Sequence, residues 1–190
     1  MEKRSLPRPL EVRAAGAGRT VAGYAAVFDV LTDIGGYFME KIAPGAFADA
    51  LSADVRALIN HDTGRVIGRT KAGTLRLSQD QTGLAVEIDL PDTADGRDLG
   101  TLIERGDISG MSFGFEVTKQ TWDETGDVPV RTIEALKLYE VSAVAFPAYD
   151  DTSIAMRSLE AARKESKRTN FNAAAMRVRM KAHLDLKGRE

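Results

Sequence analysis

Cysteine is absent from the 190 residues, and histidine occurs only twice, at His61 and His183. The lack of cysteine excludes disulfides, thiolate nucleophiles and cysteine-ligated zinc sites. Two histidines are too few for a histidine-rich metal centre. Any covalent catalysis must therefore use oxygen or nitrogen nucleophiles, and His61 is the conspicuous candidate for a general base.

Long apolar runs are also missing. No stretch approaches the roughly 18 uninterrupted apolar residues that a membrane span requires. The N-terminal MEKRSLPRPLEV lacks the apolar segment of a secretory signal. We therefore expect no membrane partner and a location in the cytoplasm. The hydrophobic fraction of 43% is high enough for one catalytic core in a chain of this length.

The charge is unevenly distributed along the chain, although the net charge is only -2. Residues 1–156 contain 16 Lys and Arg against 24 Asp and Glu, whereas residues 157–190 contain 10 against 4. This break predicts a globular domain over 1–156 and a separate basic tail over 157–190, helical or disordered. A basic tail is compatible with nucleic-acid binding, but the acidic body has no recognisable reading motif, so nucleic acid is not the expected partner.

Most of the body alternates apolar and polar residues with a period of two, which predicts β-strands. Helical spacing interrupts this pattern at about residues 45–52 and 93–105. Strands are expected at about 11–28, where a hairpin is indicated, and at 74–90, 111–122 and 130–149. The fold class is therefore mainly β with helices, and we expect an antiparallel or mixed β-barrel, closed or partly closed, flanked by helices.

A possible catalytic base and nucleophile occur at strand ends. His61 in LINHDTGRVIG ends an apolar run before a polar turn, where a backbone-bonded turn histidine would be the simpler interpretation. Ser112 in ISGMSFGF is flanked by Gly110 and Gly114, which leave room for a substrate carbonyl. The Gly-x-Ser-x-Gly pattern alone is weak, and the α/β-hydrolase elbow is excluded because no buried strand, following helix and downstream catalytic histidine surround it.

A serine hydroxyl needs an adjacent base, and the base needs a third group that orients it. Glu140 in LKLYEVSAVAFPAY is the candidate for that role, because it is a lone carboxylate between two apolar stretches. An exposed glutamate at a strand end is the alternative. Asp62 ranks below Glu140, because a sequence neighbour rarely reaches an imidazole from the correct side.

Six blocks between Gly23 and Thr152 together resemble the prohead protease family of tailed phages. In order they are GYAAVFD, EKIAPGAFADAL, LINHD with VIGRT, TGLAVEIDL, ISGMSFGF and RTIEALKLYEVSAVAFPAY. Their order and spacing are more specific than any single block. The resemblance implies a fold similar to the herpesvirus assembly proteases, a mixed barrel surrounded by helices.

The same resemblance implies roles for individual residues. His61 would be the general base, Ser112 the nucleophile and Glu140 the orienting group, with Ser109 as a rival nucleophile. Arg131 could support an oxyanion through water, although a strand-surface arginine is the simpler interpretation.

The implied function is that of a serine endopeptidase that needs no metal or cofactor, serving phages, prophages or gene-transfer particles. It would cleave the scaffold or delta segment of the major capsid protein inside the immature procapsid and then digest itself. A homodimer is possible, and the basic tail could dock to the procapsid interior or be removed by self-cleavage. The alternative function is a non-enzymatic capsid assembly or scaffold protein that keeps the protease fold.

Overall fold

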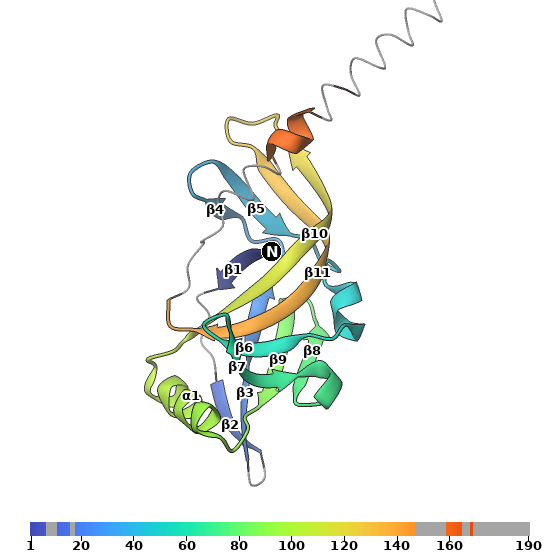
Figure 1. Cartoon of the computed structure of the whole chain (residues 1–190). Helices are drawn as coiled ribbons and strands as arrows, with labels where there is room; N and C mark the ends of the chain where they lie inside the picture. Colours follow the sequence, from blue (N-terminus) through green and yellow to red (C-terminus); the bar gives the residue numbers. More distant parts are fainter. Residues whose placement is uncertain (7–10, 16–17, 147–158, 165–167, 169–190) are drawn as a thin grey trace, which may run out of the picture. The chain divides into compact units, whose positions relative to one another are not determined.

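The computed structural model describes residues 1–6, 11–15, 18–146, 159–164 and 168 (Figure 1). The chain divides into two units, Met1–Thr152 and Ser153–Glu190. Residues 159–164 are helical, but most of the predicted basic tail over 157–190 lies outside the described residues, so the tail stays a prediction. The first unit contains every residue proposed for catalysis.

The first unit is built mainly from strands in two sheets. The larger sheet contains β1 (Glu2–Leu6), β4 (Thr32–Ile34), β5 (Phe38–Ile42), β6 (Arg56–Ile59), β7 (Asp62–Arg69), β10 (Gly110–Asp123) and β11 (Val130–Val144). The smaller sheet contains β2 (Glu11–Ala15), β3 (Gly18–Val27), β8 (Leu75–Gln79) and β9 (Gly83–Asp89). The hairpin predicted at about 11–28 is confirmed as β2 and β3, which pair antiparallel.

The long antiparallel pair β10 and β11 forms the middle of the larger sheet (Figure 1). On its outer side, β10 pairs antiparallel with β1. On the other side, β11 pairs in parallel with both β5 and β6 at different points along its length. The larger sheet is therefore mixed, and the N-terminal strand and the β6–β7 hairpin both reach the same long pair.

The sequence predicted a closed or partly closed barrel, and the prediction of closure is wrong. In the part of the chain that is described, the smaller sheet has the order β2-β3-β9-β8, and no ladder joins it to the larger sheet. The sheets are held together by side chains instead, because one core includes Val21 and Val86 of the smaller sheet and Phe113 of the larger. Alternation in a sequence shows which residues face inward, but not whether sheet edges close by hydrogen bonding.

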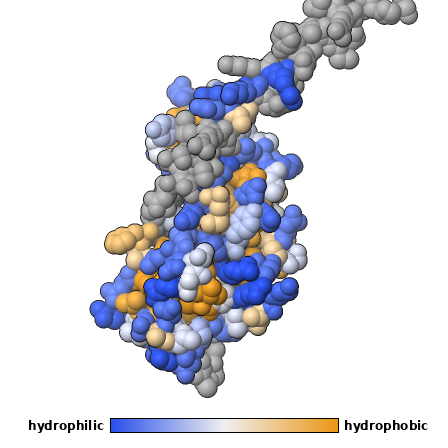
Figure 2. All heavy atoms as spheres, in the orientation of Figure 1, coloured by the Kyte–Doolittle hydropathy of each residue, from blue (hydrophilic) through white to orange (hydrophobic). Residues whose placement is uncertain are grey.

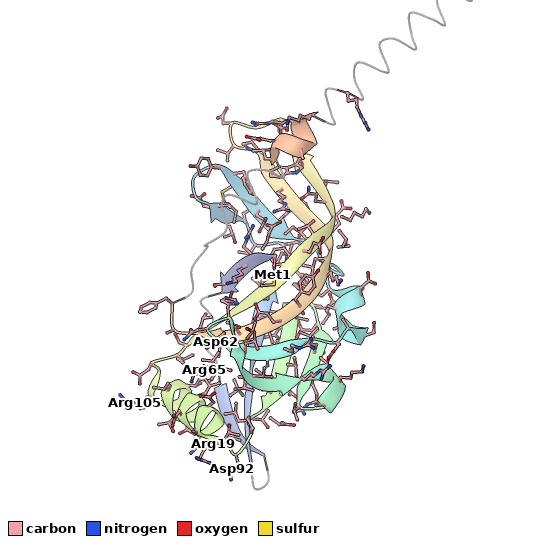
Figure 3. The ribbon with its side chains drawn as sticks, in the orientation of Figure 1. Met1, Arg19, Asp62, Arg65, Asp92 and Arg105 are labelled. Atoms are coloured by element: carbon pink, nitrogen blue, oxygen red, sulfur yellow. The ribbon has the colours of Figure 1, made fainter. Side chains whose placement is uncertain are left out.

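The helical segments are short and cover the sheets locally. The segment predicted at 93–105 is confirmed as α1 (Ala94–Arg105), which starts at an N-cap where Thr93 accepts a hydrogen bond from Gly96 and ends at Gly106 in the left-handed conformation. The segment predicted at 45–52 is a 3-10 helix, η1 (Ala48–Ser52), and a second one, η2 (Thr70–Ala72), follows β7. The side chain of Arg65 extends from β7 to an ion pair with Asp95 of α1, at 2.8 Å (Figure 3).

Figure 2 shows hydrophilic side chains over most of the visible face, with apolar atoms in separate patches. Among the described residues, none of the helices has the length and apolar character needed to cross a membrane. The interior is dense with aromatic contacts, since the ring of Phe113 lies 5.6 Å from Phe47 and 4.9 Å from Phe115. These contacts anchor the first half of β10, where six consecutive residues from Gly110 are buried.

Candidate active site

The turn between β6 and β7 presents His61. Ile59 pairs with Asp62, so Asn60 and His61 form a two-residue hairpin loop, and both have positive φ angles of 49° and 60°. Two consecutive left-handed residues are the signature of a type I′ turn, in which asparagine is favoured. A left-handed histidine is uncommon, and such backbone conformations persist only where the surroundings hold them.

The end of β11 fixes this turn. The Asn60 amide donates to the Ala143 carbonyl at 3.0 Å, and the Asn60 side-chain oxygen accepts from the Ala145 amide at 3.1 Å. The His61 amide donates to the Ser142 hydroxyl oxygen at 3.2 Å. Contacts from both residues of the loop therefore fix the position of the imidazole relative to β11.

Glu140 on β11 holds the His61 imidazole. The distance from His61 Nδ1 to Glu140 Oε1 is 2.7 Å, and the two side chains are 17% and 6% exposed. A carboxylate accepts from a protonated Nδ1, which leaves Nε2 as the unprotonated nitrogen of a neutral ring. The second carboxylate oxygen, Oε2, accepts a hydrogen bond from the Ser142 hydroxyl at 2.6 Å. Ser142 therefore positions Glu140, and Glu140 in turn holds His61 through Nδ1, so that Nε2 is the ring nitrogen left to act as a base.

Gly114 of β10 makes room for this pair. It lies opposite Glu140 in the ladder, and a Cβ at Gly114 would collide with Glu140 Oε1 and stand 2.9 Å from the Met1 sulfur. Any larger residue would displace the carboxylate. The sulfur of Met1, the residue before β1 that is labelled in Figure 3, therefore lies on the same side of Gly114 as the Glu140 carboxylate.

Ser112 lies on the same strand face as the His61–Glu140 pair. It is opposite Ser142 in the antiparallel ladder, and directly paired residues project to the same face of a sheet. Ser142 and Glu140 are two residues apart on one strand and so share that face as well. Ser112 is fully buried, and its hydroxyl donates to the backbone carbonyl of Arg4 at 2.8 Å. A hydroxyl has one proton, so in this arrangement it is directed to β1.

The other two candidates near the site lie in different surroundings. Ser109 is exposed and directly precedes β10, three residues before Ser112. Asp62 is exposed, and its carboxylate accepts a hydrogen bond from the Gly64 amide at 2.8 Å, at the start of β7. The carboxylate bonded to the His61 imidazole is therefore that of Glu140 and not that of Asp62, the residue next to His61 in the sequence.

Arg131 lies elsewhere, in a buried ion network. Its side chain is 1% exposed and donates to Glu2, Glu40 and Gln120 at 2.7 to 3.0 Å. Arg4 of β1 completes the network through Glu2 and Glu40. The structure does not bring Arg131 to the His61–Glu140 pair, because its guanidinium nitrogens are used by this network.

Electrostatics explain why four charges can be buried together. Burial raises the pKa of Glu2, but hydrogen bonds and positive charges from Arg131 and Arg4 outweigh it and keep that pKa below its usual value. Burial lowers the pKa of Arg4, yet the charges and hydrogen bonds of Glu40 and Glu2 raise it further than burial lowers it. The charged forms of Glu2 and Arg4 are therefore favoured by their partners.

A cleft of about 250 Å³ opens beside His61. Its lining comes from β1, the β6–β7 turn and the end of β11: Lys3, Ser5, Asn60, His61, Val144, Ala145 and Phe146. Phe146 is 88% exposed. Among the described residues, no group of three or more His, Asp or Glu side chains is arranged to hold a metal ion.

The comparisons with known proteins identify the family of the chain. The family model described as caudovirus prohead serine protease matches residues 8–166. The chain belongs to this prohead protease family. The resemblance inferred from the six ordered sequence blocks is therefore confirmed.

The chain is also similar to one curated protein in sequence and to one solved structure in fold. The prohead protease of Enterobacteria phage HK97 is 34% identical over 160 residues, which are 79% of this chain and 66% of that protein. The chain thus spans slightly less than two thirds of that relative's length. The capsid assembly protease of bacteriophage T4, gp21, superposes with a TM-score of 0.56 at 15% identity, covering 76% of this chain and 96% of gp21. The second likeness shows a shared fold.

Two parts of the site were missed by reasoning from the sequence. Ser142, which bonds both Glu140 and the His61 amide, could have been found because it lies two residues after Glu140 in a strand. The contact of Arg4 with Ser112 had no comparable signal, because it depends on pairing between strands more than 100 residues apart.

Proposed function

We propose that this member of the prohead protease family is a serine endopeptidase of capsid maturation. Its substrate would be the scaffold or delta segment of the major capsid protein, cleaved inside the immature procapsid in the host cytoplasm, followed by self-cleavage. The observation that carries the proposal is the 2.7 Å contact between His61 Nδ1 and Glu140 Oε1, on the strand face that Ser112 shares. Family membership supports the protease class.

The mechanism would be acyl transfer. Ser112 Oγ attacks the peptide carbonyl carbon while His61 Nε2 takes the hydroxyl proton, and Glu140 stabilises the resulting imidazolium. His61 then returns the proton to the leaving amine. Water, deprotonated by His61, hydrolyses the acyl-enzyme and restores the Ser112 hydroxyl. Throughout these steps Glu140 orients the ring.

The reaction requires the Ser112 hydroxyl to turn from the Arg4 carbonyl to His61. Catalytic hydrogen bonds are often long or misaligned before substrate binds and tighten in the complex. Ser109 is the rival nucleophile, since it is exposed and lies in the same ISGMS segment. We favour Ser112, because it shares a sheet face with Glu140 and Ser142.

The experiment is co-expression with the cognate major capsid protein, followed by intact mass measurement. The parent chain should remove an N-terminal segment from the capsid protein. Ser112→Ala and His61→Ala should lower the rate by about 10⁶-fold, as expected when a nucleophile or its base is lost. Ser109→Ala is the matched control and should cleave normally.

Two other outcomes would change the proposal. Full cleavage by Ser112→Ala, with loss in Ser109→Ala, would reassign the nucleophile to Ser109. A parent chain that co-assembles with capsid protein but cleaves nothing would point to a non-enzymatic assembly protein. Sedimentation of the purified chain would test the expected homodimer separately.

A further inference from the structure

The cleft beside His61 has an apolar wall. Three consecutive residues at the end of β11 and just beyond it form this wall, namely Val144, Ala145 and Phe146. The rest of the lining is polar and includes Asn60, the neighbour of His61 in the β6–β7 turn. Figure 1 shows the end of β11 next to the β6–β7 hairpin, with which it pairs through β6. A concave site that combines an apolar surface with a few polar groups is typical of ligand binding.

Phe146 is the most exposed large apolar side chain in the described part of the chain, at 88%. Val144 is buried and Ala145 is half-buried, so these two form the base of the wall and the Phe146 ring stands in solvent. Single exposed apolar residues are ordinary on protein surfaces. Phe146 differs from the exposed Tyr37, because Tyr37 lies in the turn between β4 and β5 whereas Phe146 borders the cleft of the proposed general base.

The backbone before Phe146 is fixed to the turn that carries His61. The Ala145 amide donates to Asn60 Oδ1 at 3.1 Å, and the Asn60 amide donates to the Ala143 carbonyl at 3.0 Å. Asn60 and His61 are the two residues of this hairpin loop. The Phe146 ring is therefore attached one residue beyond a point that is bonded to the loop of the base, which holds the ring near His61.

The reaction assigns this cleft to one side of the scissile bond. In acyl transfer the general base takes the proton of the nucleophile and then gives it to the leaving amine. The leaving amine must therefore lie next to the His61 ring, while the acyl group remains on Ser112. Since the cleft opens beside His61, it is the place for the substrate segment that follows the scissile bond.

Asn60 supplies a polar contact in the same cleft. A side-chain amide has an acceptor oxygen and two N–H donors, and the oxygen of Asn60 is used by the Ala145 amide. Among the described residues, none accepts a hydrogen bond from Asn60 Nδ2. A backbone carbonyl of a bound peptide is a matching acceptor. The cleft therefore offers a donor for the backbone of a peptide and the Phe146 ring for one of its side chains.

We propose that Asn60 and Phe146 form a subsite for the segment after the scissile bond. A large aliphatic or aromatic side chain of the substrate packs on the Phe146 ring, and Asn60 Nδ2 donates to a backbone carbonyl of the same segment. This rests on the proposed function, because it names the substrate chemistry and a specificity-determining residue of that same site.

The proposal predicts the residue type that follows the cut. Packing of an apolar side chain on the ring removes both surfaces from water, whereas a polar side chain in that place would lose hydration without gaining a partner. The substrate therefore carries a large apolar residue at the first or second position after the scissile bond.

Binding of short peptides tests the subsite without requiring catalysis. The full chain with Ser112→Ala would be titrated with two neutral dye-labelled peptides, acetyl-Leu-Leu-Gly-Gly and acetyl-Gln-Gln-Gly-Gly, and fluorescence anisotropy would be measured. We expect the leucine peptide to bind at least about 5-fold more tightly, because leucine and glutamine are similar in size but differ in hydration. The preference should fall below about 2-fold when Phe146→Ala is added, because the apolar surface is then lost.

Tyr37→Ala is the matched control for the loss of an exposed aromatic ring. Added to the Ser112→Ala chain, it should leave the preference for leucine unchanged, because Tyr37 does not line the cleft. Thermal unfolding of the Phe146→Ala and Tyr37→Ala proteins should stay close to that of the parent, since both rings are largely exposed.

Asn60→Asp tests the backbone contact. Aspartate also favours the left-handed turn conformation and keeps an acceptor for the Ala145 amide, but it has no Nδ2 donors. Both peptides should bind several-fold more weakly, with their ratio unchanged, because a contact to the backbone does not depend on the side chain. An unchanged affinity would remove Asn60 from the subsite.

The outcomes separate this proposal from the protease function. No binding of either peptide, equal binding of the two, or a leucine preference that persists in Phe146→Ala would overturn the subsite, even where the parent chain cleaves capsid protein. A parent chain that cleaves nothing, while its Ser112→Ala form prefers leucine through Phe146, would reject the protease function alone.

Cleavage of capsid protein extends the test to the reaction. Sequencing the new N-terminus would identify the first two residues after the cut, and the large apolar residue found there would be replaced by glutamine. We expect kcat/KM to fall at least about 5-fold with the parent protein and under about 2-fold with Phe146→Ala, since only the parent has the ring to discriminate. A cut followed by two small or charged residues would contradict the proposal.

Discussion

Two buried polar clusters lie on opposite faces of the larger sheet and differ in how completely their groups are paired. On one face, Arg131 and its partners form a network in which two guanidinium groups and two carboxylates neutralise one another. On the other face, the carboxylate of Glu140 meets one nitrogen of His61 and the hydroxyl of Ser142. One cluster has its charges matched in number, and the other leaves an imidazole nitrogen beside a cleft.

The difference shows why buried charge alone does not identify a catalytic group. Arg131 is among the most buried side chains of the protein, yet its donors are occupied by acceptors of its own network. His61 is less buried and has an open ring nitrogen. Catalysis needs a group whose protonation can change during the reaction, whereas a fully paired network resists that change.

Among the substitutions that keep His61, Glu140→Gln should lower the activity of the His61–Glu140–Ser142 cluster the most. The amide keeps the shape of the carboxylate but no longer stabilises an imidazolium, and it can hold the ring in the wrong tautomer. We expect kcat to fall by about 10⁴-fold, as for other serine proteases that lose the orienting acid. The measurement is the cleavage rate of capsid protein. A fall below about 10-fold would remove Glu140 from the mechanism.

Breaking the opposite cluster should cost stability instead. Arg131→Met keeps much of the side-chain volume but leaves Glu2 and Glu40 with one cation between them. We expect a loss of about 3–5 kcal/mol in the free energy of unfolding, the usual cost of removing one partner from a buried ion pair. Urea unfolding would measure it. An unchanged unfolding midpoint with lost cleavage would place Arg131 in the chemistry after all.

The sequence predicted the elements whose signals are local. The hairpin of β2 and β3 and the helix α1 follow from periodicity over a dozen or so residues, with Thr93 and Gly106 at the helix ends. Closure of a barrel is a property of sheet edges far apart in the chain, so alternation could not decide it.

The same distinction applies to the site. His61 could be named because the chain has only two histidines, and Glu140 because it is a lone carboxylate between two apolar stretches. Their contact across 79 positions, and the approach of Arg4 to Ser112 across 108, depend on strand register. Register is set by the packing of whole strands, which no single segment of the sequence encodes.

A smaller effect should come from Ser142→Ala. Glu140 would lose a charge-assisted hydrogen bond of about 1.5 kcal/mol, and the His61 amide would lose its acceptor. We expect kcat to fall about 10-fold with KM unchanged, since Ser142 positions other residues and is buried away from the cleft. An increase in KM alone would instead indicate contact with substrate.

The smallest change in the free energy of unfolding should come from breaking a surface ion pair, that of Arg76 with Asp89, and we compare it with the loss in the buried Arg131 network. A hydrogen bond from Arg76 lowers the pKa of Asp89 to about 2, although both side chains are nearly half exposed. A lowered pKa stabilises the fold above the ordinary value near 3.8, and this contribution is lost as the pH falls through about 2. Solvent screening limits the loss in Arg76→Ala at pH 7 to under about 1 kcal/mol.

Urea unfolding of Arg76→Ala and the parent chain across this pH range would check the comparison. The difference in the free energy of unfolding between the two proteins should become smaller as Asp89 is protonated, and it should also become smaller at high salt. A loss comparable to that of Arg131→Met would mean that the number of partners, and not burial, determines the contribution of ion pairs in this fold. A loss below about 1 kcal/mol would show that burial explains why Arg131→Met costs more stability than Arg76→Ala.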